Sequence, residues 1–238
     1  SWHFDESSGA SLTDDSPNQN NGTLTNMNTS TCWTNSRVGN ALDFDGTVGY
    51  VDCGNDSSLL PSGSFSVSAW IYSNGYVNSG SVYNIMLARG NPFSQGGGYG
   101  FAIDSTETLR FVANNARALS GVNIKGRWVY AVGVYDSYEG KLKIYIDGVL
   151  EGETSCSGLI SDTQNFFIGK DSLNARYFNG LVDEVQIHNI AIEPRPLAKY
   201  KTFHNNDTMN IVPDWLWPDP TVPITNTALH ESFNSMAG

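Results

Sequence analysis

Phe65-Ser-Val-Ser-Ala-Trp-Ile-Tyr72 is the stretch of sequence that decides the fold. Its residues alternate with period two, so the two sides of a strand would carry Phe65, Val67, Ala69 and Ile71 on one side and Ser66, Ser68, Trp70 and Tyr72 on the other. Alternation of this kind is typical of a strand with one buried face. The stretch therefore predicts an antiparallel sheet that packs one side against a core.

The same period recurs in residues 127–135 and 141–147, which are joined by the turn Asp136-Ser-Tyr-Glu-Gly140 and should form an antiparallel hairpin. A second turn at Asp147-Gly148 reverses the chain again. Further candidate strands lie at residues 41–45, 49–53, 82–89, 99–104, 108–114, 165–169 and 180–188. About a dozen short strands separated by Gly, Asn and Ser clusters predict an all-β sandwich of two packed antiparallel sheets.

The acidic composition of the chain excludes some classes of binding partner. The 238 residues carry 24 Asp and Glu against 13 Lys and Arg, a formal net charge of −11, with no block of basic residues. Nucleic acid is therefore excluded as a partner, because such binding depends on cations that displace counterions. No apolar stretch approaches the length needed for membrane insertion. The polar surface has few charges, which favours an extracellular or cell-surface location.

One helix is predicted, at residues 194–203, where Pro194 suits a first turn and Leu197, Tyr200 and Phe203 share a face. From residue 204 onward four prolines interrupt a stretch that holds Trp215 and Trp217. We therefore expect a domain at residues 1–203 followed by an irregular tail or linker at residues 204–238. The tail has two interpretations: a linker laid on the sandwich surface, or an arm for self-association with a neighbouring copy.

Nine stretches, taken in order, carry a family resemblance: Trp2-His-Phe-Asp-Glu6, Asp15-Ser-Pro-Asn-Gln-Asn-Asn-Gly-Thr23, Gly39-Asn-Ala-Leu-Asp-Phe-Asp-Gly46, Tyr50-Val-Asp52, Phe65-Ser-Val-Ser-Ala-Trp-Ile71, Trp128-Val-Tyr-Ala-Val132, Ile144-Tyr-Ile-Asp-Gly148, Phe167-Ile-Gly169 and Phe178-Asn-Gly-Leu-Val-Asp-Glu-Val-Gln-Ile-His-Asn189. Together they resemble the laminin-G-like jelly-roll family (LamGL), in the pentraxin-like branch of the concanavalin A-like lectin and glucanase superfamily. Pro17 departs from the family, which usually has Gly there. The resemblance implies a jelly-roll sandwich, usually secreted or surface-displayed, that binds glycans or proteins and often holds a structural calcium.

The loop from Asp15 to Asn21 gathers a carboxylate and amides, the all-oxygen chemistry that Ca²⁺ prefers. In the wider superfamily a calcium often ties the first strand to the last. Carried onto this sequence, the resemblance implies five candidate metal ligands: Asp15, Asn20 and Asp183, with Asn18 and Asp5 as weaker ones. The alternative is an Asx-rich turn whose side chains bind their own backbone.

Catalysis is not expected. The glucanase motif Glu-x-Asp-x-x-Glu is absent from the sequence, and Asp183 and Glu184 are adjacent, which sends them to opposite faces of a strand. Glu151 and Glu153 have the right spacing, but they follow a turn on a predicted edge strand, where solvated carboxylates are ordinary. The sequence therefore predicts that the protein is not an enzyme.

Sugar sites combine an aromatic plate with amide, carboxylate or guanidinium groups. Loop residues of these types are Trp33, Tyr76, Asn78, Tyr99, Asn114, Asn115 and Arg117, whereas Trp70, Trp128, Phe65 and Phe111 lie in alternating strands and are interpreted as packing residues. The first hypothesis is an extracellular non-catalytic module that binds a glycan or glycoprotein ligand. The second is a structural subunit of a cell-surface filament or adhesive assembly that uses its C-terminal tail for contacts between subunits.

Two kinds of modification remain open. Four patterns for N-glycosylation occur, at Asn21, Asn28, Asn55 and Asn206, in a chain so rich in Asn that chance alone could supply them. Cys32 and Cys53 are the pair most suited to a disulfide, and the alternative is that these two and Cys156 are buried free thiols.

Overall fold

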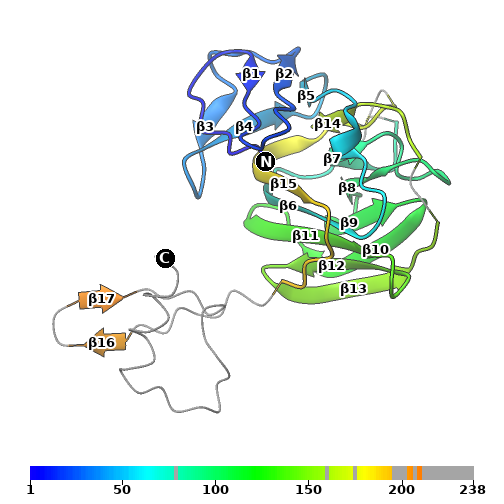
Figure 1. Cartoon of the computed structure of the whole chain (residues 1–238). Helices are drawn as coiled ribbons and strands as arrows, with labels where there is room; N and C mark the ends of the chain where they lie inside the picture. The colour runs from blue at the N-terminus through cyan, green and yellow to red at the C-terminus, as the bar shows by residue number, and fades with distance from the viewer. Residues whose placement is uncertain (78–79, 159–160, 174–175, 195–202, 206–207, 211–238) are drawn as a thin grey trace. The chain divides into compact units, whose positions relative to one another are not determined.

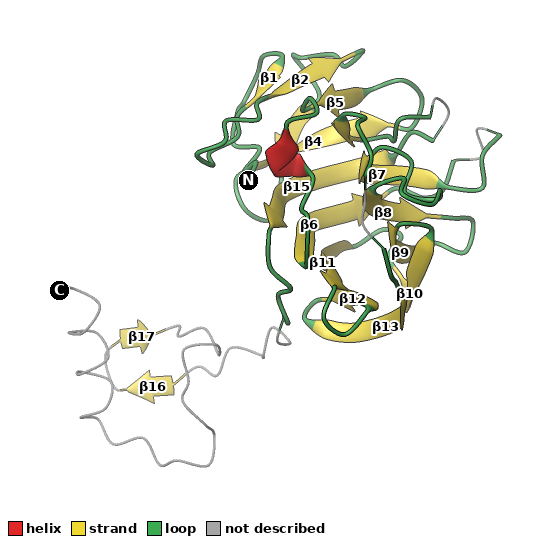
Figure 2. Cartoon of the chain, turned by 45° about the vertical axis from the view of Figure 1, so that its right-hand side comes forward, coloured by secondary structure: helices red, strands yellow, loops and turns green. Residues whose placement is uncertain are grey.

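The structure is a computed structural model that describes residues 1–194 apart from 78–79, 159–160 and 174–175, together with residues 203–205 and 208–210. Two large antiparallel sheets, of eight and seven strands, make up the fold (Figure 1). The predicted all-β sandwich is confirmed. Figure 2 shows one short helical turn, η1 (Ser57–Leu59), in the described part of the chain.

The eight-stranded sheet places its strands in the order β1 (Ser11–Leu12), β2 (Gly22–Thr25), β5 (Tyr50–Asp52), β14 (Phe166–Ile168), β7 (Asn84–Arg89), β8 (Tyr99–Ile103), β9 (Thr108–Ala113) and β10 (Ala116–Asn123). The seven-stranded sheet has the order β13 (Val149–Ser155), β12 (Lys141–Ile146), β11 (Trp128–Asp136), β6 (Phe65–Ser73), β15 (Asn179–His188), β4 (Asn40–Asp45) and β3 (Trp33–Asn35). Strands distant in sequence therefore become neighbours, as β5 and β14 do in Figure 1.

The alternation in β6 sets the two faces of its sheet as predicted. Its four inward side chains, Phe65, Val67, Ala69 and Ile71, are fully buried. The Phe65 ring lies 4.9 Å from the Tyr99 ring and 6.2 Å from the Phe111 ring, both of which come from the other sheet. Burying a side chain of this size contributes roughly 1.5–3 kcal/mol. These interleaved rings therefore join the two layers.

The predicted hairpin is confirmed as β11 and β12, whose register runs from Ala131 opposite Ile146 to Asp136 opposite Lys141. The following turn is built by Asp147 and Gly148, with φ of 52° and 82°. Positive φ at both central residues is the type I′ geometry, which matches the twist of paired strands. The Asp147-Gly148 dipeptide therefore forms the tight turn that the sequence predicts.

The first residues of the chain meet the last strand of the sandwich. The Trp2 backbone nitrogen donates to the Val185 carbonyl oxygen at 2.8 Å, and the Trp2 ring stacks on Phe166 with 5.5 Å between centroids. The Trp2 indole nitrogen donates to the carbonyl oxygen of Asn20 at 2.9 Å. One buried tryptophan therefore ties together β15, the other sheet and the loop before β2.

The chain divides into two compact units, Ser1–Pro194 and Arg195–Gly238. The second contains β16 (Phe203–Asn205) and β17 (Thr208–Asn210), which pair antiparallel. Residues 195–202 of the predicted helix lie outside the described residues, and Phe203 lies in β16 rather than in a helix. Among the described residues, no helix has the length and apolar character needed to cross a membrane.

Candidate functional site

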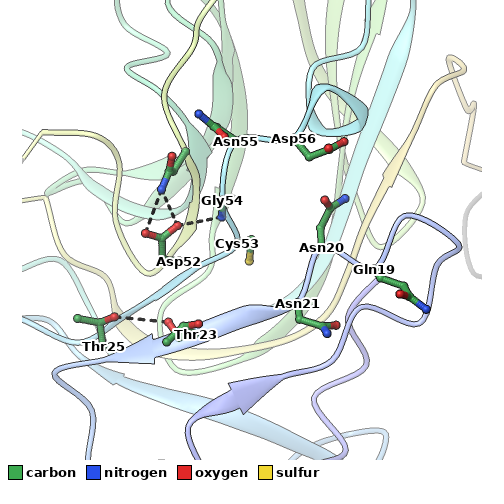
Figure 3. A pocket seen from close by; sticks show the side chains of 11 residues that line it. Gln19, Asn20, Asn21, Thr23, Thr25, Asp52, Cys53, Gly54, Asn55 and Asp56 are labelled. Atoms are coloured by element: carbon green, nitrogen blue, oxygen red, sulfur yellow. Dashed lines mark hydrogen bonds between the residues drawn. The ribbon is translucent and has the colours of Figure 1, made fainter.

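An open pocket of about 720 Å³ lies beside the outer face of β2 and β5 (Figure 3). Amide, hydroxyl and carboxylate side chains dominate its lining, which consists of Gln19, Asn20, Asn21, Thr23, Thr25, Asp52, Cys53, Gly54, Asn55, Asp56 and Asn165. Figure 3 shows Asp52 and Asn20 on opposite sides of the opening. A lining of this chemistry suits a ligand with many hydroxyl groups. We call this site the Asp52 pocket.

Asp52 owes its position to the pleat of β5, because Val51 points into the core and its two neighbours point outward. The carboxylate accepts hydrogen bonds from Asn165 Nδ2, at 2.8 Å to Oδ1 and 3.0 Å to Oδ2, and from the Gly54 backbone nitrogen at 2.9 Å. An ionised carboxylate has about four acceptor sites, so these bonds fix its orientation and leave an acceptor position for a ligand.

Two aromatic rings stand on the same outer face as Asp52. Phe167 is paired directly with Asp52 across β14 and β5, and its ring meets that of Tyr50 edge to face with 5.7 Å between centroids. The Lys170 ammonium lies 4.1 Å from the Tyr50 ring centroid and 4.6 Å from that of Phe167. Burial lowers the pKa of Lys170, and the charges of Asp171 and Asp52 oppose that shift. The two rings and the Lys170 ammonium therefore lie beside the Asp52 pocket rather than in its lining, with the rings at about a right angle to one another.

A row of directly paired residues continues from these rings across the sheet. Its members, from β2 to β10, are Thr23, Asp52, Phe167, Ala88, Gly100, Val112 and Arg117. Paired residues of an antiparallel sheet share one face, and neighbouring strands lie about 4.8 Å apart, which places Asp52 and Arg117 about 24 Å from one another along the row. The outer face of the eight-stranded sheet therefore carries polar groups near both of its ends.

A family model described as the concanavalin A-like lectin/glucanases superfamily matches residues 45–198, well over half of the chain. The protein belongs to this superfamily. The match includes the strands that carry the row from β5 to β10, whereas β2 precedes it. A comparison with curated proteins finds no match.

Solved structures show the same superfamily fold. Domain 4 of AbnA, an extracellular arabinanase from Geobacillus stearothermophilus solved with arabinotriose, is 19% identical with a TM-score of 0.53, covering 72% of this chain and 83% of that one. The sialidase of Trypanosoma rangeli with sialic acid is 16% identical with a TM-score of 0.56, covering 80% and 30%. Botulinum neurotoxin type C, described as interacting with two ganglioside molecules, is 16% identical with a TM-score of 0.55, covering 79% and 49%.

Most of the ligand-binding residues predicted from the sequence lie far from one another in the structure. Tyr99 is a correction: it is fully buried between the sheets, and its hydroxyl donates to the Leu59 carbonyl oxygen at 2.7 Å. Burial raises the pKa of the Tyr99 hydroxyl. A residue in this position packs the core and offers no surface to a ligand.

The other predicted ligand-binding residues are dispersed. Trp33 lies on β3, at the edge of the other sheet, and its indole nitrogen donates to the Gly9 carbonyl oxygen at 3.1 Å. The Tyr76 hydroxyl bonds the Ser81 carbonyl oxygen, and Asn78 lies outside the described residues. Asn114 is buried and donates to the Ser157 carbonyl oxygen at 2.6 Å. Of this set, the described residues bring together Asn115 and Arg117, at 3.4 Å.

Sequence reasoning missed the groups that form the Asp52 pocket. Tyr50 and Asp52 are two residues apart in a predicted strand, so the sequence does predict that their side chains share one face. Asn165 enters the lining, and Phe167 and Lys170 lie beside it, because β14 is the neighbour of β5, which no local sequence pattern predicts.

The predicted calcium ligands do not converge. The centre of the N-terminal loop is the buried carboxylate of Asp14, not Asp15. Burial opposes ionisation of Asp14, but hydrogen bonds from the Ser1 nitrogen, from Ser16 and from the Asn20 backbone nitrogen lower its pKa overall. Asp15 is exposed and lies 3.9 Å from His3. This arrangement matches the alternative of an Asx-rich turn whose side chains satisfy its own backbone.

The remaining calcium candidates lie with other partners. Asp183 is buried, and its carboxylate accepts from Ser36 Oγ at 2.6 Å and from the Glu184 nitrogen at 2.7 Å. Asp5 accepts from the Asn40 nitrogen at 3.4 Å, and Asn18 is exposed. Within the described ranges, no group of three or more His, Cys, Asp or Glu residues could hold a metal ion. The residues therefore do not fit a preformed calcium site, and calcium binding stays a prediction.

The modification candidates have mixed positions. Cys32, Cys53 and Cys156 are buried free thiols, so the expected Cys32–Cys53 disulfide is not formed and the alternative is what the structure shows. Burial raises the pKa of each thiol. Asn21 and Asn55 are exposed and line the Asp52 pocket, Asn28 is exposed, and Asn206 lies outside the described residues.

Proposed function

We propose that this protein is a non-catalytic module that binds a glycan in the Asp52 pocket. The observation that carries the proposal is the Asp52 carboxylate, which Asn165 and Gly54 hold in place on the same face as the Tyr50 and Phe167 rings. A sugar presents hydroxyl groups on its edge and C–H groups on its faces. Asp52 and the surrounding amides bind the hydroxyls, and the Tyr50 and Phe167 rings beside the pocket offer apolar surface to the C–H groups.

Similar structures support a saccharide as the ligand class. The proteins compared above were solved with arabinotriose or sialic acid, or are described as interacting with gangliosides. One of them is an extracellular enzyme and another is a toxin that enters cells. We therefore assign this module to the cell exterior or surface, where glycans and glycoproteins are its ligands.

The chemistry of the pocket supports binding without cleavage. Glycoside hydrolysis needs two carboxyl groups, one of which is an acid with a raised pKa. The second carboxylate of the pocket is Asp56, and hydrogen bonds from Ser58 lower its pKa. Glu153, the other sequence candidate for a catalytic pair, is bonded to Lys141 at 2.9 Å on the exposed edge strand β13, and its pKa is lowered by that partner.

The test is binding of the full chain to a glycan array, followed by calorimetry with the best ligand. Asp52→Ala removes the charged acceptor and should weaken binding by about tenfold or more, because a hydrogen bond to a charged group contributes about 1.5–3 kcal/mol. The matched control is Asp136→Ala, which removes a carboxylate from the last residue of β11 on the other sheet. Binding to no glycan, or equal binding by wild type and Asp52→Ala, would refute the proposal.

Assembly through residues 204–238, the second function expected from the sequence, stays a prediction. It is checked by light scattering of the full chain and of a chain that ends at Phe203. A monomeric state of both chains would contradict it.

A further inference from the structure

Three arginines surround one pair of stacked rings above the outer face of the eight-stranded sheet. Tyr83 and Phe93 stack with 4.3 Å between centroids and 9° between planes. The guanidinium carbon of Arg117 lies 5.4 Å from the Phe93 centroid, and that of Arg176 lies 5.2 Å from the same centroid. Arg110 lies 4.9 Å from the Tyr83 centroid. We call this group the Phe93 cluster.

The chain brings these five groups together from five separate segments. Phe93 belongs to the loop between β7 and β8 and packs, with Tyr83, on the small residues Ala88 and Ala102. Arg117 stands on β10 at the far end of the row that begins at Thr23. The loop therefore covers the middle of the row, and the Phe93 cluster is a site separate from the Asp52 pocket.

The charges of the cluster are not balanced. Arg110 pairs with Asp104, and Arg176 pairs with the buried Asp171 at 2.9 Å. Arg117 is exposed, and among the described residues its polar contact is the amide oxygen of Asn115 at 3.4 Å, with no carboxylate in ion-pair range. An arginine without a carboxylate partner, on the same ring as a second guanidinium, leaves a local positive charge in a chain with a net charge of −11.

Donor groups are left over as well. A guanidinium has five N–H donors, of which the described contacts of Arg176 use Nη1 alone, toward Asp171 Oδ2 and toward Asn91 Oδ1 at 3.4 Å. Nε of Arg110, a residue that is 6% exposed, has no hydrogen-bond partner among the described residues. Arginine forks match the geometry of carboxylate and sulfate oxygens, and stacking on a ring orients them in advance.

We propose that the Phe93 cluster is an anion-binding site that takes the carboxylate or sulfate group of an acidic saccharide between Arg117 and Arg176. Phe93 acts as the common support that keeps the two guanidinium groups in place. The inference extends the proposed function, because it specifies a class of glycan, and it assigns recognition of the charge to a different part of the sheet from recognition of hydroxyls.

The experiment compares three probes with the full chain: methyl β-glucuronide, glucose 6-sulfate and methyl β-glucoside, each titrated by NMR or calorimetry at low and high salt. We expect the wild type to bind one or both charged sugars about tenfold more tightly than the neutral one. That preference should shrink as salt rises, because the guanidinium groups are at the surface. The two charged probes distinguish a carboxylate site from a sulfate site.

Arg117→Ala should remove the preference and leave the fold unchanged by circular dichroism, because the side chain is exposed. The matched control is Arg127→Ala, which removes an exposed arginine that pairs with Asp147 on the other sheet. Equal affinity for charged and neutral sugars, or an Arg117→Ala variant that keeps the preference, would overturn the inference.

The same titrations separate this inference from the proposed function. A neutral sugar that binds wild type and not Asp52→Ala, without any preference for charge, refutes the Phe93 cluster site alone. Charged sugars that bind Asp52→Ala but not Arg117→Ala support the cluster site and show that it acts independently of the Asp52 pocket. Failure of every probe to bind overturns the cluster site, and the glycan array then decides the proposed function.

Discussion

The buried carboxyl group of Asp183 should make the free energy of unfolding fall as the pH rises toward neutrality. This carboxyl group is fully buried on β15 and has Ser36 and the Glu184 backbone nitrogen as its hydrogen-bond donors. Burial raises its pKa from 3.8 to about 7; the two hydrogen bonds oppose that shift, and the charges of Glu184 and Asp5 add to it. The folded state therefore binds this proton more tightly than the unfolded state does, and loses that advantage when the group ionises.

The magnitude follows from the shift. Each pKa unit corresponds to about 1.36 kcal/mol, so ionised Asp183 costs the folded state about 4 kcal/mol at pH values above 7 and almost nothing below pH 4. Between pH 5 and pH 8 the cost grows by about 2.5 kcal/mol. Asp183→Asn keeps the shape of the side chain and cannot ionise. The free energy of unfolding of the variant, relative to that of the wild type, should therefore rise by about 2.5 kcal/mol from pH 5 to pH 8.

The assay is urea denaturation of wild type and Asp183→Asn at pH 5, 6, 7 and 8. Asp171, whose pKa burial raises to about 6, is present in both proteins and cancels in the difference. Glu151→Gln is the matched control, since Glu151 lies on the edge strand β13. A difference between wild type and Asp183→Asn that stays constant across the pH range would refute the reasoning.

Three further predictions address packing, thiols and metal. Gly133→Ala should lower the free energy of unfolding by about 1–3 kcal/mol, because the added Cβ would collide with the Phe111 ring. Gly121→Ala is the control and should have little effect, because the nearest atom to its added Cβ is 3.9 Å away. Equal melting temperatures of the two variants would contradict this prediction. All three cysteines should resist a thiol reagent in the native protein and react in urea, and one reactive thiol per unfolded chain would instead indicate a disulfide. EDTA tests the calcium prediction: because the described residues form no preformed site, we expect an unchanged melting temperature, and a fall of several degrees would instead support bound calcium.

The fold was predictable because alternation encodes sidedness directly. In β6 every residue assigned to the inner side is buried, and the hairpin of β11 and β12 forms where its turn residues predicted it. The N-terminal loop shows the limit of the method. There a single position separates the buried Asp14 from the exposed Asp15, and adjacent side chains on an extended backbone point in opposite directions. A composition-based argument cannot choose between two neighbouring carboxylates.

The candidate site was less predictable because it depends on the order of strands. Thr23, Asp52 and Asn165 come from segments more than a hundred residues apart at the extremes, and they meet because β2, β5 and β14 are successive strands of the sheet. Tyr99 failed for a related reason. It follows the glycine-rich stretch 96–98 and begins the strand predicted at residues 99–104, but its ring faces the core rather than the adjoining loop.

The two acceptor asparagines on the rim of the Asp52 pocket, Asn21 and Asn55, have a consequence for how the protein is produced. An oligosaccharide attached by the secretory machinery at either position would project over the entrance and compete with any ligand from outside. Material from a bacterial host would have an unobstructed entrance, whereas material from a eukaryotic host would carry its own sugar beside the binding groups. The cell that makes the protein would thus act as a regulator of its affinity.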